Sequence, residues 1–192
     1  MVVFKLSTTF SILKAYQSTQ MKGVLPCPSP TRLNCQKGGP PLSQPQYASM
    51  RFAKYKGPEI TNIEAHNERR KEKYASNPDI DLSRSKHNFH LIEPPQRYRA
   101  EAERQISAAG CRTRKDSVRL VEILFTATPE FFKGKKLPEI RQYFEEALRF
   151  FEQYQSRETI ISAVVHMDEK TPHMHLSFVP LTPDGRLSAK EI

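Results

Sequence analysis

The segment VVHMDEKTPHMHLSF, residues 164–178, places three of the chain's six histidines within ten positions, beside Asp168 and Glu169. Imidazole nitrogens are common ligands of divalent transition metals. A lone histidine on a strand is usually only a hydrogen-bonded polar residue. Three that converge without a metal would place cationic or poorly paired groups together at an energetic cost. The segment therefore predicts a metal site.

The spacing indicates how these histidines converge. Side chains alternate along a strand, so His173 and His175 share one face, and His166 and Asp168 share a face of the preceding strand. Residues 169–172 suit a hairpin loop, which would set Asp168 opposite His173 and His166 opposite His175. The intervening positions form apolar rows: Ile161, Ala163, Val165 and Met167, then Met174, Leu176 and Phe178. We therefore expect His166, His173 and His175 to bind a divalent ion, with Mn, Zn or Fe-type ions favoured over Mg.

A second group, in AHNERR, has His66 and Arg69 three positions apart. Residues 58–75 read as a charged helix, on which this spacing gives a shared face. A solvated helix face explains such a pair without any function. A metal that binds a scissile phosphate, however, needs a nucleophile and a cation nearby. Neutral imidazole can attack phosphorus, and arginine can clamp phosphate oxygens or orient the nucleophile, so both residues are candidate catalytic groups.

Composition sets limits on the class of protein. The chain has 192 residues, enough for one domain with a core and a tail. No run of about 18 apolar residues is present, so no membrane insertion is expected. Cys27, Cys35 and Cys111 are odd in number and widely separated, which fits a reducing cytoplasm rather than a disulfide framework. The net charge of +9 divides into +5 on residues 1–49 and +4 on the remainder, which permits nucleic-acid binding without proving it.

The chain divides near Met50. Residues 1–49 hold six of the fifteen prolines and no acidic residue, so we expect a disordered or upstream extension, with a genuine basic arm as the alternative. Residues 50–192 are expected to form the folded domain. Near the end, Ser188 and Glu191 have the spacing that begins a helix, so we expect this domain to be truncated at its C-terminal side.

The folded part alternates strands and helices. Strands are expected over residues 50–57, 85–92 and 117–128, in addition to the two histidine strands. Helices are expected over residues 58–75, 94–110 and 137–155. The last helix is the most regular, with one apolar face formed by Ile140, Phe144, Leu148 and Phe151. This order predicts an α+β fold, an antiparallel sheet carrying helices on one face.

Three segments, HNERR, SRSKHNFHL and HMDEKTPHMHLSFVPLTPDGRLSAKEI, resemble the ordered motifs of the MobV (Mob/Pre) plasmid mobilisation and recombination relaxases, which are HUH endonucleases. The resemblance covers residues 50–192. It implies an HUH-type sheet and an enzyme that nicks one strand of a plasmid transfer origin and stays attached to the 5′ phosphate. It matches His166, His173 and His175 to the ligands of a divalent metal, with manganese indicated and Mg²⁺ or Zn²⁺ as alternatives.

The same resemblance matches His66 to the nucleophile and Arg69 to a supporting arginine. Asp168 and Glu169 fall at acidic positions that would orient the histidines or the nucleophile. Where some relatives have Asn-Tyr, this chain has Asn88-Phe89, which excludes a tyrosine nucleophile there. Tyr74 and Tyr98 match no motif, so the expected adduct is a phosphoramidate on His66. The residues expected to contact DNA are Asn67, Arg70, Lys86, Asn88 and Lys170.

The expected partner is origin DNA with a single strand or hairpin, and the missing C-terminal region is a candidate for self-association. Two other functions remain open. One is a metal-dependent phosphodiesterase that uses water as the nucleophile. The other is a truncated domain that binds origin DNA without cleaving it.

Overall fold

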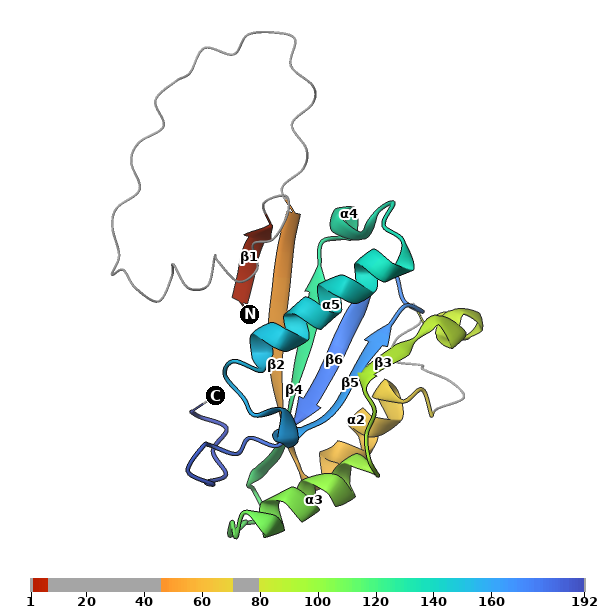
Figure 1. Ribbon diagram of the computed structural model, residues 1–192. Helices are drawn as coiled ribbons and strands as arrows, with labels where there is room; N and C mark the ends of the chain where they lie inside the picture. The colour runs from red at the N-terminus through yellow and green to blue at the C-terminus, as the bar shows by residue number, and fades with distance from the viewer. Residues whose placement is uncertain (1, 7–45, 71–79, 192) are drawn as a thin grey trace, which may run out of the picture.

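The computed structural model describes residues 2–6, 46–70 and 80–191. Their core element is an antiparallel sheet with strand order β1-β2-β4-β6-β5-β3 (Figure 1). The strands are β1 (Val2–Leu6), β2 (Gln46–Lys56), β3 (Phe89–Ile92), β4 (Val118–Ala127), β5 (Ile160–His166) and β6 (His173–Phe178). The α-helices are α2 (Ile60–Asn67), α3 (Tyr98–Ala108), α4 (Pro129–Phe132) and α5 (Leu137–Phe151), and the 3-10 helices are η1 (Gly57–Glu59), η2 (Leu82–His87) and η3 (Arg157–Thr159). None of the described helices is long and apolar enough to cross a membrane.

Helices cover both faces of the sheet. Helix α5 packs on one face over a core that includes Val121, Ile123 and Phe125 of β4. Helices α2 and α3 pack on the opposite face over a second core that includes Leu120. The α+β antiparallel fold is therefore confirmed, but the expectation of helices on one face is wrong. The reason lies in β4, where the neighbouring residues Leu120 and Val121 point to opposite faces and are both almost fully buried.

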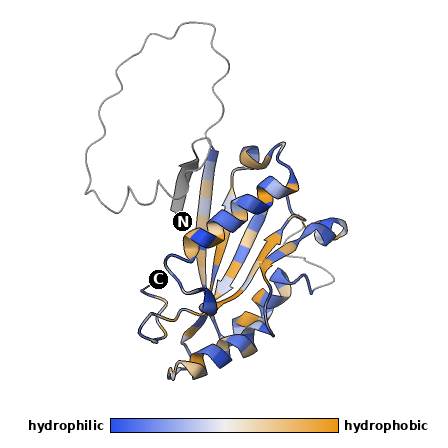
Figure 2. Cartoon of the chain, viewed as in Figure 1, coloured by the Kyte–Doolittle hydropathy of each residue, from blue (hydrophilic) through white to orange (hydrophobic). Residues whose placement is uncertain are grey.

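Helix α5 confirms its predicted apolar face. Ile140, Phe144, Leu148 and Phe151 are all buried in the core between helix and sheet. Figure 2 shows hydrophilic residues on the outward side of α5 and hydrophobic residues along β5. The helix begins with Glu139 accepting a hydrogen bond of 2.9 Å from the backbone N–H of Lys136, which satisfies one of the free donors of the first turn.

The hairpin of β5 and β6 has a different register from the predicted one. His166 lies opposite His173, and Val164 lies opposite His175. Strand β5 ends at His166 because Asp168 turns away to bind Arg69, so the connection is longer than expected. The register is shifted by two residues, which preserves every face, so the three histidines still share one face as predicted.

One position of the predicted apolar row in β5 is wrong. The register shifts between Ile160 and Ser162, which is typical of a β-bulge. As a result Ile160 joins the core beneath α5, whereas Ile161 joins the core beneath α2 and α3. Ala163 and Val165 lie in the α5 core as expected.

The N-terminal boundary differs in detail from the expectation. Strand β2 begins at Gln46 rather than at Met50, and it pairs with β1, which belongs to the stretch expected to be disordered. Residues 7–45 of that stretch lie outside the described residues, so the domain division at Met50 stays a prediction. Strand β3 begins at Phe89, since the residues before it form η2 instead of continuing the predicted strand.

The predicted start of a helix near the end of the chain is not borne out in the described residues. Ser188 Oγ donates a hydrogen bond of 3.1 Å to Glu191 Oε1, whereas a capping box joins each of these side chains to the backbone N–H of the other residue, and residues 189–190 form a turn. The positive φ of Gly110, 68°, agrees with the prediction that this glycine ends the preceding helix.

The α5 interface should dominate the stability of the domain. Phe144 is fully buried, so Phe144→Ala should lower the free energy of unfolding by about 3–5 kcal/mol through lost burial and a residual cavity. Urea denaturation followed by circular dichroism measures the change. Leu137→Ala, at a side chain 50% exposed on the same helix, is the control and should change it by less than about 1 kcal/mol. Equal effects of the two substitutions would contradict this packing.

Candidate metal centre and nucleophile

Four histidine rings meet on the sheet face that α2 flanks. His166 ends β5, His173 and His175 belong to β6, and His66 lies in the last turn of α2. The His166 ring centroid lies 5.2 Å from that of His173 and 4.7 Å from that of His175. The His66 ring lies 5.3 Å from His175 and 5.8 Å from His166. The structure thus joins the two sequence motifs in one cluster.

Two of the strand histidines are each held by a backbone acceptor at one ring nitrogen. His166 Nε2 lies 2.8 Å from the backbone oxygen of Asn67, and His173 Nδ1 lies 2.9 Å from that of Thr171. Each of these nitrogens must be the N–H donor, because a carbonyl oxygen can only accept. The other nitrogen of each ring, His166 Nδ1 and His173 Nε2, is then left with a lone pair available to a metal.

His175 lies beside a carboxylate that the sequence analysis missed. Its Nδ1 lies 3.1 Å from Glu122 Oε1, and Glu122 also accepts a hydrogen bond of 2.7 Å from Asn67 Nδ2. Burial raises the pKa of Glu122, but the neighbouring His175 and the hydrogen bonds outweigh burial and lower it. The sequence does contain a signal for this residue, since Glu122 is the lone acidic residue inside the apolar run VRLVEILFTA. A carboxylate buried in such a strand needs a polar partner.

The donor set fits a divalent metal. The buried polar atoms of the described residues that have no hydrogen-bond partner include His166 Nδ1 and both ring nitrogens of His175, a costly state that a bound cation would relieve. Two sets of three residues could each hold a metal ion, because within each set the potential ligand atoms all lie within 4.8 Å of one another. One set is His66, His166 and His175, and the other is His166, Glu169 and His173. Both sets include His166. A cavity of about 370 Å³ opens beside them, lined in part by His66, His173 and His175.

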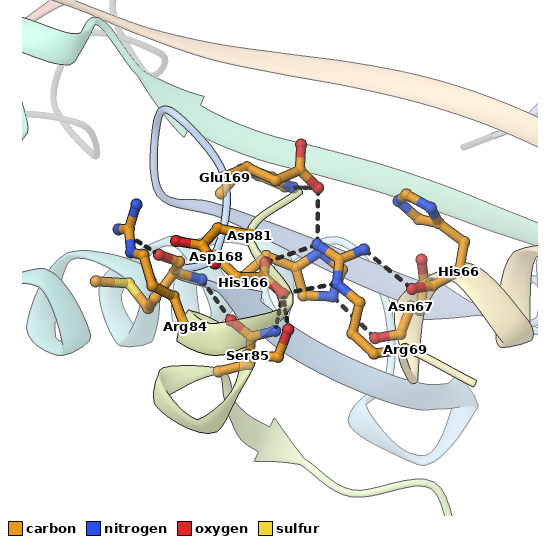
Figure 3. Close-up of polar contacts among 12 residues, drawn as sticks. His66, Asn67, Arg69, Asp81, Arg84, Ser85, His166, Asp168 and Glu169 are labelled. Carbon is orange, nitrogen blue, oxygen red and sulfur yellow. Dashed lines mark hydrogen bonds and ion pairs between the residues drawn. The ribbon is translucent and has the colours of Figure 1, made fainter. Parts of the chain in front are cut away.

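Arg69 is placed differently from the prediction. Helix α2 ends at Asn67, and Arg69 has a φ of 49°, so it shares no helix face with His66. Its guanidinium instead binds Asp168 with two hydrogen bonds, 2.9 Å from Nε and 2.7 Å from Nη2. Nη1 donates to the backbone oxygen of His66 at 3.2 Å. In Figure 3 the guanidinium lies between Asp168 and the end of α2 that carries His66.

Asp168 anchors this arrangement. Its side chain is fully buried and accepts further hydrogen bonds from Ser85 Oγ at 2.6 Å and Asn88 Nδ2 at 2.8 Å. Burial raises the pKa of Asp168, but the hydrogen bonds from Arg69, Ser85 and Asn88 outweigh burial and hold it well below the ordinary value. Asp168 therefore faces Arg69 and not His173, and it orients the arginine rather than a metal-binding histidine. Glu169 accepts a bond of 2.7 Å from the same guanidinium and points toward His173, 3.7 Å away.

His66 is suited to act as a nucleophile. Burial, followed by the neighbouring His175 and Arg69, lowers the pKa of His66 to about 4. The imidazole is therefore neutral near pH 7, and only the neutral ring has a lone pair that can attack. Tyr98 is fully buried and donates a hydrogen bond of 2.7 Å to Glu68, which removes it from reach of a substrate. Tyr74 lies outside the described residues.

The residues expected to contact DNA divide into two groups. Asn67 is 1% exposed and holds Glu122, and Asn88 binds Asp168 and the backbone N–H of Met167, so both serve to build the site. Arg70, Lys86 and Lys170 are exposed; Lys170 lines the cavity beside the histidines, and Arg70 binds the buried Glu64. DNA contact by each of these residues stays a prediction.

The fold and the site together define a class of protein, an α+β domain with a cluster of histidines that could hold a divalent metal ion and a further, neutral histidine beside them. The chain belongs to the Mob/Pre family, described as plasmid recombination enzyme, whose sequence profile matches residues 44–192. This membership confirms the resemblance seen in the three motifs.

Individual relatives agree with this assignment. The chain is 37% identical over 149 residues to a plasmid recombination enzyme of Bacillus thuringiensis, covering 77% of this chain and 33% of the relative. It is 39% identical over 150 residues to one of Lactiplantibacillus plantarum, covering 76% and 41%. The chain therefore spans about a third to two fifths of the length of the curated relatives it matches.

A solved structure matches in fold as well. The relaxase domain of MobM, crystallised with manganese and bound to origin-of-transfer DNA of plasmid pMV158, superposes with a TM-score of 0.70. The two are 32% identical, and the match covers 74% of each chain. A second Mn-bound MobM complex gives a TM-score of 0.68 at 31% identity.

Glu122 should act on the metal through His175. Glu122→Gln removes the carboxylate charge while keeping the shape, so it should weaken Mn²⁺ binding by about 10–100-fold. Isothermal titration calorimetry with manganese chloride measures this affinity. Glu130→Gln, at an exposed position, is the control and should bind like wild type. His175→Ala should abolish tight binding. Unchanged affinity in Glu122→Gln would show that the carboxylate does not orient the ligand.

Asp168 should matter for stability and not for metal affinity. Asp168→Asn leaves the buried Arg69 with Glu169 as its remaining charged partner and removes the buried carboxylate that it binds with two hydrogen bonds, which should lower the free energy of unfolding by about 3 kcal/mol in urea denaturation at pH 7. Because the folded-state pKa is lowered, the charged carboxylate stabilises fully above its ordinary pKa of about 4, and this contribution is lost as the pH falls below it. The stability difference from wild type should therefore shrink in acid.

The control for this substitution is Asp116→Asn, at an exposed aspartate, which should leave stability unchanged. Mn²⁺ affinity measured alongside should stay within about threefold of wild type for Asp168→Asn, against about 10–100-fold for a residue that orients a metal ligand. A large loss of affinity in Asp168→Asn would instead make Asp168 part of the metal centre.

Proposed function

We propose that this chain is the relaxase domain of a plasmid mobilisation and recombination protein, which nicks one DNA strand at a transfer origin by transesterification. The observation that carries the proposal is the position of His66. Its neutral ring lies 5.3 Å and 5.8 Å, between centroids, from the rings of His175 and His166, two of the three proposed metal ligands. A phosphate bound at that centre would lie beside the nucleophile.

His166, His173 and His175 would hold a divalent metal, with manganese favoured because the related MobM structures are Mn-bound. When bound, the metal supplies Lewis-acid polarisation of the scissile phosphate and stabilises charge on its oxygens. Imidazole ligands also suit Mn or Zn better than Mg, which prefers oxygen ligands.

His66 performs the covalent step. A ring nitrogen of His66 forms a bond to phosphorus while the bond from phosphorus to the 3′ oxygen breaks, and the 3′ oxygen takes up a proton to leave as a hydroxyl. The 5′ phosphate is left on His66 as a phosphoramidate. No water is consumed, so the released 3′-hydroxyl can attack the adduct and rejoin the strand, which recombination requires.

Arg69 positions the nucleophile. Its Nε and Nη2 donate hydrogen bonds to Asp168, and Nη2 also donates to Glu169. The remaining nitrogen, Nη1, donates to the backbone oxygen of His66. Of the two roles weighed for this arginine, orienting the nucleophile is favoured over clamping the phosphate. The exposed Lys170 lines the cleft and provides positive charge for the DNA backbone, and Lys86 is a further exposed cation.

The adduct tests the proposal directly. The protein is incubated with Mn²⁺ and a single-stranded oligonucleotide carrying the pMV158 origin, and in parallel with a randomised single-stranded library, because the origin recognised by this chain can differ. We expect a covalent adduct that is labile in acid, maps to His66 by peptide mass, and is absent from His66→Ala. His87→Ala, at an exposed histidine, is the control and should form the adduct at an undiminished level.

Other outcomes would select other functions. An acid-stable adduct on Tyr74 or Tyr98, or an adduct that persists in His66→Ala, would show that the nucleophile is wrongly assigned. Cleavage without any adduct would indicate a phosphodiesterase that uses water. Binding without cleavage would indicate a DNA-binding domain only.

A further inference from the structure

The face of the sheet that carries the histidines continues beyond them onto strands β4 and β2. In one row across the sheet His175 pairs with Leu124, and Leu124 pairs with Arg51. In the next row His173 pairs with Thr126, and Thr126 pairs with Ser49. Directly paired residues of antiparallel strands point to the same face. Arg51 and Ser49 therefore share the face of the metal centre, two strands or about 10 Å away from β6.

This part of the face is uncovered. Further along β4, Leu120 and Glu122 are buried beneath α2 and α3. Leu124 and Thr126, on the same face, are partly exposed and line the cavity of about 370 Å³ at the histidine cluster. Arg51 is exposed. The open surface on β2 is thus continuous with the cleft in which the scissile phosphate would lie.

The side chains of this surface suit a nucleic-acid strand. Ser49 and Thr126 are short, so they form a floor that does not obstruct an incoming chain. Arg51 makes no ion pair within the part of the chain that the structure describes, in contrast to Arg69 and Arg70. Tyr47, two residues further along the same face, is 36% exposed and offers an aromatic ring. A free guanidinium binds phosphate, and an exposed ring stacks on unpaired bases.

We propose that Tyr47, Ser49 and Arg51, here called the β2 surface, bind the single-stranded DNA that adjoins the scissile phosphate. Arg51 contacts a backbone phosphate, and Tyr47 stacks on a base further along the strand. The inference rests on the proposed nicking function and adds where the flanking strand runs. Single-stranded DNA is the assigned partner because its unpaired bases can reach an aromatic ring, whereas bases within a duplex are stacked on one another.

The test measures fluorescence anisotropy of a fluorescein-labelled single-stranded oligonucleotide of mixed sequence over a range of salt concentrations. Arg51→Ala should weaken binding about fivefold at low salt and reduce the slope of log affinity against log salt by about 0.7, the loss of one phosphate contact on a single strand. Arg51→Lys keeps the charge and should restore the slope. Tyr47→Ala should weaken binding at least about fivefold with the slope unchanged.

Matched controls lie on the same strand. Lys54 and Phe52 alternate with Arg51 and point to the opposite face of β2, so Lys54→Ala and Phe52→Ala remove a cation and an aromatic ring without touching the β2 surface. Both should bind DNA as wild type does. All variants should retain wild-type Mn²⁺ affinity, which shows that the metal centre remains intact.

The outcomes separate this inference from the proposed function. If wild type forms the His66 adduct but Arg51→Ala and Tyr47→Ala bind DNA as tightly as wild type, the β2 surface is wrong and the function stands. If wild type binds no single-stranded DNA, both are overturned. An equal loss of affinity for a duplex of the same sequence would replace the assigned partner with double-stranded DNA and would also overturn the inference.

Discussion

The ion pair between Arg69 and Asp168 is the contact on which the candidate site depends. It joins the segment that follows α2, the helix that carries His66, to the loop that follows β5, the strand that carries His166. The same carboxylate gathers Ser85 and Asn88 from the segment before β3, so three stretches distant in sequence meet at one buried group. A charge buried in this way is tolerated because both carboxylate oxygens accept hydrogen bonds, two of them from a guanidinium of matching shape.

The shared face of the strand histidines could be predicted from the sequence, because it depends only on the alternation of side chains along a strand. His166, His173 and His175 point to one face whether or not the hairpin closes at the predicted position, since an error of two residues in register preserves faces. The register itself was not readable. It follows from Asp168 leaving the strand to meet Arg69, and that pairing joins residues almost a hundred positions apart.

The features of the site that could not be predicted from the sequence all depend on contacts between residues far apart in the chain. Residues 58–75 have a helical composition, yet α2 stops at Asn67, where the backbone oxygen is taken by His166 and Arg69 adopts a positive φ. Glu122 is a charged residue in an otherwise apolar strand, and its partners His175 and Asn67 lie far from it in the sequence. By contrast, the apolar face of α5 is a local pattern, and the structure reproduces it in full.

The two halves of the site are attached to the domain in different ways. Strands β5 and β6 each have a hydrogen-bonded neighbour on both sides, so the backbone that carries the proposed metal ligands opens only when the sheet opens. Helix α2 is eight residues long and is fixed at its end by side chains rather than by a ladder of backbone bonds. Amide protons of β6 should therefore exchange with solvent far more slowly than those at the end of α2. The strands that carry His166, His173 and His175 therefore keep their spacing when the short helix beside them opens, so the two halves of the candidate site differ in local stability.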